Sequence, residues 1–216
     1  MTKEFRKHII VRNCTKEYKD YHSYRPYLEQ DFMHRCAYCD MHDEWIAPLS
    51  FQIDHFIPRE KFEKAGRTDL DNDYRNLMYA CPVCNRLKSD CFDGEIPERE
   101  ISNPYLYNPV DVDYNKIFYR DEDGYIRSED PLGRQMIRQL QLYRPTKHMA
   151  WLMDEIKTVY DELEQKIEVE KDPHKKQLLE SAQDKLGAEL YKRHRILVHS
   201  FKTEKNSKDI FREGKI

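Results

Sequence analysis

The chain has 216 residues, which suits one folded domain with an extension, and its aromatic content of 12% excludes a disordered chain although 36% of the residues are charged. No apolar run approaches the ~20 residues that cross a bilayer, and the first residues lack a signal peptide's features, so we expect a cytoplasmic protein without membrane contact. The net charge of −3 does not favour a polyanionic partner, because phosphate binding depends on Lys and Arg.

The first predicted element is a helix within residues 16–35. Its aromatic side chains and Leu28 have helical spacing, and Pro26 must lie near the helix start. Residues 49–56 alternate in the manner of a strand, and Pro58 ends regular pairing after it.

A second strand and a short helix complete this part of the chain. Residues 60–75 are polar and rich in turn-forming types, which predicts an irregular or partly helical connection. Residues 76–81 are predicted to form the second strand. Pro82 is favoured in the first turn of a helix, so residues 82–92 are predicted to be helical. The result is a β-β-α unit.

The rest of the chain is predicted to change from short strands to helices. Residues 121–126 are typical of a hairpin turn, and two long helices are predicted at 149–170 and 174–198, able to pack as an antiparallel hairpin. An earlier helix at 133–144 places four residues on one face: Met136, Ile137, Leu140 and Tyr143. The long helices carry apolar stripes: Leu152, Ile156, Val159, Leu163 and Ile167, then Leu178, Leu179, Ala182, Leu186 and Leu190. These stripes either complete the core or dock on another subunit.

Four of the six cysteines form two C-x-x-C pairs, Cys36 with Cys39 and Cys81 with Cys84. In a reducing cytosol this doubled spacing favours a metal over disulfides, and two such pairs complete a four-thiolate structural zinc site. The alternative is that the four residues are buried or redox-active thiols. No role is assigned to the other two, Cys14 and Cys91.

The order of these motifs resembles the HNH endonuclease family, which has a ββα-metal fold. The resemblance rests on C-x-x-C, then Ile-Asp-His-Phe-Ile-Pro, then Asn-Leu, then C-x-x-C-Asn-x-x-Lys, and it covers about 55 residues. It implies that His55 is the general base and that Asp54 and Asn85 supply oxygen ligands to a catalytic Mg²⁺ or Mn²⁺. Asn76 would hold the loop that bears the base. Outside this context, each residue would more often be a turn former or a surface residue.

Four basic residues beside these motifs are candidates for contacts with nucleic-acid phosphates, although Lys and Arg near a helix are mostly solvated. They are Arg59, Lys61, Arg86 and Lys88. The charge distribution permits such a partner, because residues 1–35 carry eight Lys or Arg against five Asp or Glu, and residues 191–216 carry eight against three. Residues 154–190 carry six against eleven. Local basic patches attract polyanions even on a slightly acidic chain.

The region after this core bears a second, looser resemblance. It resembles the HNH subunit of Septu-type anti-phage systems, which pairs with an SMC-like ATPase. The matching positions are Asn108, Pro109, Gly124, Arg134, Ile137, Leu140, Leu142 and Arg144. This resemblance implies a role in bacterial defence and an ATPase partner.

We therefore expect an α+β fold in three parts. These are a helical lead-in at 1–34, a ββα-metal HNH core with its four-cysteine zinc site at 35–92, and a mixed, then helical, extension at 93–216 that could dock a partner. The expected function is metal-dependent endonuclease activity on nucleic acid, with double-stranded DNA the first candidate. Two alternatives stay open: a non-catalytic zinc-ribbon module that binds nucleic acid or acts as a scaffold, and an RNA-cleaving HNH enzyme.

Overall fold

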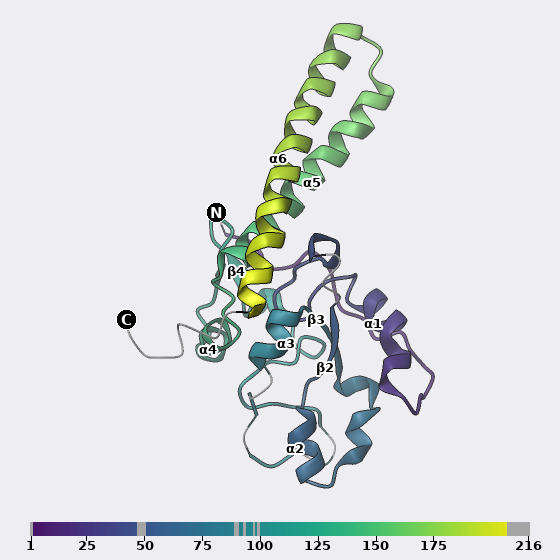
Figure 1. Ribbon diagram of the computed structural model, residues 1–216, viewed down its shortest axis with the longest axis vertical. Coiled ribbons are helices and arrows are strands. Elements are labelled where there is room, and N and C mark those ends of the chain that lie inside the picture. The colour runs from purple at the N-terminus through teal and green to yellow at the C-terminus, as the bar shows by residue number, and fades with distance from the viewer. Residues whose placement is uncertain are drawn as a thin grey trace.

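The computed structural model describes residues 2–46, 51–88, 91–92, 94–96, 98 and 100–206. At its centre, strand β2 (Gln52–His55) pairs antiparallel with strand β3 (Leu77–Ala80), and helix α3 (Pro82–Lys88) follows and contacts β2 (Figure 1). The sequence predicts the same order. The predicted strand starts earlier, at residues 49–50, which lie outside the described residues. The predicted helix runs to residue 92; residues 89–90 lie outside the described residues, and residues 91–92 are not helical, which corrects the predicted end.

The register of β2 on β3 decides which side chains of β2 face α3. Asp54 lies opposite Met78, and His55 lies opposite Leu77. Because side chains alternate along a strand, Asp54 points to the side of the sheet that α3 covers, while His55 points to the other side. The contacts described below agree with this alternation.

Helix α1 (Arg25–Asp31) leads into the first cysteine pair. Pro26 lies in its first turn, as predicted, and Leu28 is fully buried. The helix is shorter than the predicted one and is preceded by a single 3-10 turn at Tyr21–Tyr24. Met33 has a positive φ of 51°, so the chain leaves the helix through a sharp turn.

The connection between β2 and β3 is partly helical, which confirms the prediction. It contains helix α2 (Arg59–Lys64) and 3-10 turns at Thr68–Asp71 and Tyr74–Asn76. Phe62 and Leu70 from this connection are buried in a small apolar cluster of their own. The Phe62 ring also packs against His55 of β2, so the connection is folded against the strand.

A second sheet has the order β1-β4-β5 and consists of β1 (Lys3–Glu4), β4 (Tyr119–Arg120) and β5 (Ile126–Arg127). The β4–β5 hairpin confirms the predicted turn, while β1 was not predicted. Gly124 in this turn has a φ of 88°, and a Cβ there would lie 2.0 Å from the ring of Trp151. Only glycine fits this position.

Helix α4 (Pro131–Gln139) follows the second sheet. Met136 is buried, but Tyr143 is 40% exposed, which contradicts its predicted place on the same helix face as Met136. The helix ends before this position, and Gln141 has a positive φ of 48°. The chain therefore turns, and Leu142 is the buried residue instead.

Helices α5 (Pro145–Val169) and α6 (Pro173–Asn206) pack as an antiparallel hairpin, which confirms that prediction (Figure 1). We call this hairpin the arm. It projects from the rest of the molecule. None of residues 156–190, the outer arm, is fully buried. Within the described ranges, no helix combines the length and the apolar character that a membrane crossing requires.

The half-buried apolar residues of α5 from residue 156 onward define the stripe along which the outer arm packs. They are Ile156, Tyr160, Leu163 and Ile167, and their spacing is the heptad spacing of a coiled coil. The predicted stripe contained Val159 in place of Tyr160, but Val159 is 46% exposed. Tyr160 thus takes the place of Val159 in the packing stripe.

One hydrophobic cluster joins the three segments distinguished in the sequence. Phe5 and Leu28 enter it from the lead-in, Cys84 from the centre, and Met136 and Leu197 from the C-terminal helices. The base of the arm and the N-terminal strand are therefore built into the same core as β2 and β3.

Candidate active site and metal centre

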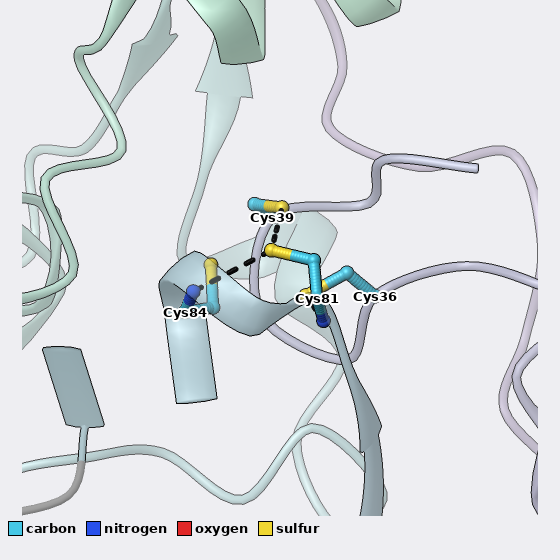
Figure 2. Close-up of side chains that lie close together, drawn as sticks. All are labelled: Cys36, Cys39, Cys81 and Cys84. Carbon is cyan, nitrogen blue, oxygen red and sulfur yellow. Dashed lines mark hydrogen bonds between the residues drawn. The ribbon is translucent and has the colours of Figure 1, made fainter. Parts of the chain in front are cut away.

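The cysteines of the two C-x-x-C pairs lie together in the interior (Figure 2). Their four sulphur atoms all lie within 4.8 Å of one another, and the Sγ atoms of Cys39 and Cys81 are 3.9 Å apart. Four thiolates bound tetrahedrally to one zinc ion at ~2.3 Å would have their sulphur atoms about 3.8 Å apart. The donor type and the spacing therefore both fit zinc.

Backbone contacts explain why the pairs converge. The amide of Ala37, inside the first pair, donates to the carbonyl of Tyr79 on β3 at 2.8 Å, and this bond fixes the first turn beside the strand. Cys81 directly follows β3, and Cys84 lies in the first turn of α3. The amide of Cys81 donates to Cys36 Sγ at 3.3 Å, which suits a sulphur atom that carries negative charge.

Lys147 of α5 reaches this cluster from the base of the arm. The residue is 1% exposed, and its Nζ lies 3.3 Å from Cys81 Sγ. Burial opposes the charged form, but the surrounding sulphur atoms outweigh it and raise the pKa of Lys147 above its usual range. The sequence gives no signal for this contact, because 66 residues separate the two partners.

The carboxylate of Asp54 is buried on the α3 side of β2. The hydroxyl of Tyr38 donates to Oδ2 at 2.6 Å, and Nζ of Lys88 lies 2.9 Å from Oδ1. Lys88 also donates to the backbone oxygen of His55 at 2.6 Å and is only 1% exposed. The structure thus places Lys88 in an internal ion pair rather than on the expected phosphate-binding surface.

The imidazole of His55 lies on the other side of the sheet and is nearly buried. Its ring packs edge-on against Tyr21 and Phe62, with centroid distances of 4.8 and 5.6 Å. Nε2 lies 2.9 Å from the backbone oxygen of Asp71 and 3.4 Å from its carboxylate. A carbonyl oxygen can only accept, so Nε2 carries the proton of the neutral ring and Nδ1 holds the lone pair. Within the described parts of the chain, nothing hydrogen-bonds to Nδ1.

The surroundings of His55 favour its neutral form. Burial lowers the pKa of His55 below its usual value of 6.5, while the hydrogen bond to Asp71 and the charges of Asp71 and Asp54 oppose the shift, and Arg59 adds to it. A histidine with a lowered pKa is unprotonated at neutral pH. Nδ1 can therefore accept a proton under these conditions.

Asn76 is fully buried and ties together the two loops beside His55. Its Oδ1 accepts from the amide of Ile57 at 2.8 Å, and its Nδ2 donates to the carbonyl of Leu70 at 3.1 Å. Its own carbonyl accepts from the amide of Phe56 at 2.7 Å. These are hydrogen bonds to nearby backbone, the kind of contact that the sequence-based role of Asn76 requires.

Asn85 lies half-buried on α3, on the same side of β2 as Asp54. Its Nδ2 donates to Oε1 of Gln52 at 2.8 Å. The structure therefore brings Asn85 and Asp54 to one side of the strand and His55 to the other. Among the described residues, no contact joins the His55 ring to Asp54 or Asn85, although the charge of Asp54 does act on His55 through space.

The remaining basic candidates lie nearer the surface. Arg59 is exposed, and its guanidinium lies 3.1 Å from the carboxylate of Asp71, the residue that also binds His55. Lys61 is half-buried on α2, and Arg86 is exposed on α3. Arg59 and Arg86 are therefore accessible to solvent, and Lys61 is partly accessible.

Two residues of this site were not singled out from the sequence. Asp71 belongs to a run of Asp and Asn that indicates only a turn, and its backbone oxygen reaches His55 because of the fold. Tyr38 lies between the cysteines of the first pair, so the turn that brings those cysteines together also directs the Tyr38 hydroxyl to Asp54. Its place inside the motif is the one signal that could have identified it.

Comparison with known proteins gives one match. Residues 36–90 match the family model described as HNH endonuclease. This stretch contains both cysteine pairs, β2, β3 and α3. No curated protein and no solved structure matches the chain. The match indicates a nuclease-type function for this part of the molecule.

Proposed function

We propose that the protein is a metal-dependent HNH endonuclease with a ββα-metal site, which hydrolyses phosphodiester bonds in nucleic acid, with double-stranded DNA as the first candidate substrate. One observation carries the proposal: His55 donates from Nε2 to the Asp71 carbonyl, and this bond leaves Nδ1 as a base. The family match over residues 36–90 supports the same class of function.

In this proposal, Nδ1 of His55 removes the proton of a water molecule as that water attacks the phosphorus atom. The hydrogen bond to Asp71 holds the required tautomer, and contacts with Tyr21 and Phe62 restrict the ring plane. When the ring becomes positively charged, the Asp71 carboxylate at 3.4 Å stabilises it. Asn76 keeps the backbone around the base in place.

Asp54 and Asn85 would hold the divalent cation, which supplies charge stabilisation for the phosphate and the leaving oxygen. Their side-chain oxygens are the hard donors that Mg²⁺ and Mn²⁺ prefer. A carboxylate has about four lone-pair positions, and Tyr38 and Lys88 occupy two of those on Asp54. Because Lys88 already offsets the charge of Asp54, we expect weak cation binding until substrate phosphate adds further oxygen ligands.

Cleavage of supercoiled plasmid and of a structured RNA tests the proposal. With Mg²⁺ present, the wild-type protein should cut, and His55→Ala should be slower by at least ~10²-fold with unchanged nucleic-acid affinity. His174→Ala is the matched control, because His174 is exposed at the far end of the arm. Equal rates for wild type and His55→Ala would overturn the assignment. Binding without cleavage would favour the zinc-ribbon alternative, and cleavage of RNA alone would favour the RNA enzyme.

We further propose that the nuclease works with a partner, an SMC-like ATPase of a Septu-type defence system. The arm supports this proposal, because its far end exposes two large apolar side chains: Val169 is 75% exposed and Leu178 is 60% exposed. Leu179 and Leu186, also members of the predicted stripe, are half-buried in the hairpin. The exposed pair is therefore the better candidate for docking.

A further inference from the structure

Lys147 lies in the interior, and its ammonium group donates a hydrogen bond to a cysteine sulphur. The residue is 1% exposed, and its Nζ lies 3.3 Å from Cys81 Sγ and 5.6 Å from the centre of the Phe201 ring. Among the residues that the structure describes, no carboxylate lies within ion-pair distance of this ammonium group. A buried lysine without a carboxylate requires another source of negative charge.

The cysteine cluster is such a source when zinc is bound. Four thiolates around one Zn²⁺ leave a surplus of two negative charges in a site where all four cysteines are at most 1% exposed. A surplus of this kind is costly in a medium of low dielectric constant. The buried ammonium group needs a negative partner, and the zinc–thiolate cluster needs a positive one. Each therefore supplies the charge that the other lacks.

We infer that Lys147 is an outer partner of the zinc centre: its ammonium group donates a hydrogen bond to the Cys81 thiolate and offsets part of the negative charge of the zinc–thiolate cluster. Groups that bind metal ligands in this way typically change metal affinity by 10- to 100-fold. Lys147 is also in the first turns of α5. It therefore ties the base of the arm to the metal that holds the centre together.

Zinc affinity measured by chelator competition on the full chain tests the inference. Lys147→Met keeps much of the apolar stem and removes the charge, so it should bind zinc at least ~10-fold more weakly. Lys166→Met is the matched control, because Lys166 is an exposed lysine on the same helix. Wild-type zinc affinity in Lys147→Met would overturn the inference.

A spectroscopic measurement separates the charge of Lys147 from a merely structural role. In the cobalt-substituted protein, removal of a positive charge beside a thiolate raises the energy of its lone pairs. The thiolate-to-cobalt charge-transfer band of Lys147→Met should therefore shift to lower energy, while that of Lys166→Met should not. An unshifted band in a folded Lys147→Met protein would contradict the inference.

Two further variants decide the matter if Lys147→Met does not fold. Lys147→Gln is neutral and Lys147→Arg keeps the charge. If the Lys147→Arg protein folds and binds zinc while the Lys147→Gln protein does not, the inference is supported, because Arg keeps the positive charge and Gln does not. If Lys147→Arg fails as Lys147→Gln does, or if both bind zinc like the wild type, the inference is wrong.

Discussion

The centre of the molecule, residues 36–88, and the outer arm, residues 156–190, are stabilised in different ways. In the centre, Asn76 and Lys88 are at most 1% exposed and bind residues far away in sequence. In the outer arm no residue is fully buried, and ion pairs are local, such as Lys157 with Asp161 at 3.2 Å. The centre therefore holds a fixed arrangement of polar groups, while the outer arm is a helical hairpin in which α5 and α6 pack on each other.

Loss of zinc should produce the largest difference in stability between the centre and the outer arm. Structural zinc supplies on the order of 10 kcal/mol of apparent binding energy in small modules, so Cys81→Ser should unfold the centre. The arm should keep most of its helix, because its packing stripe does not involve the metal. Near-UV circular dichroism should therefore be lost while much of the far-UV helical signal remains. Purified protein without stoichiometric zinc, or Cys81→Ser with unchanged thermal stability, would exclude the zinc centre.

The same substitution placed in each region should have unequal effects. Leu77 on β3 in the centre is fully buried, so Leu77→Ala should lower the free energy of unfolding by about 2–5 kcal/mol. Leu163 is half-buried in the outer arm, so Leu163→Ala should cost roughly 1 kcal/mol, because it leaves a smaller cavity. Urea unfolding of the zinc-loaded proteins measures both. Equal losses would show that the arm is packed as tightly as the centre.

The smallest effect on stability is expected at the exposed end of the arm. Leu178→Asp should change the free energy of unfolding by no more than about 0.5 kcal/mol, since this side chain is 60% exposed. Its neighbour Leu179 is half-buried, so Leu179→Asp should loosen the hairpin and serves as the contrast. If the arm docks a partner ATPase, the Leu178→Asp protein should be folded and fail to co-purify with it. Retained wild-type affinity would argue against docking at this end.

Local patterns in the sequence predicted the parts of the fold that depend on neighbouring residues. The C-x-x-C spacing, the alternation around Asp54 and His55, and Pro82 at the start of α3 all act within a few residues. The convergence of the cysteines could also be predicted, because four thiolates around one ion form a geometry that the chain must satisfy.

Features that depend on the whole fold could not be predicted in this way. The place of Tyr143 depends on a positive φ at Gln141, and the exposure of Val159 depends on how α6 lies against α5. The ion pair of Lys88 with Asp54 could not be predicted from the sequence for a related reason. A lysine on a short helix is usually solvated. Only the packing of α3 on β2 shows that the ammonium group of Lys88 forms an ion pair with the buried carboxylate of Asp54.

The pH dependence of cleavage tests the role of His55 most directly. Burial lowers the pKa of His55 below 6.5, and the base acts only when unprotonated, so its activity is lost as pH falls through that lowered pKa. With saturating Mg²⁺ under single-turnover conditions, the logarithm of the wild-type rate should rise by about one unit per pH unit in acid and level off below pH 6.5. A rate that keeps rising above pH 7.5, or one that does not change with pH, would contradict a neutral His55 as the general base.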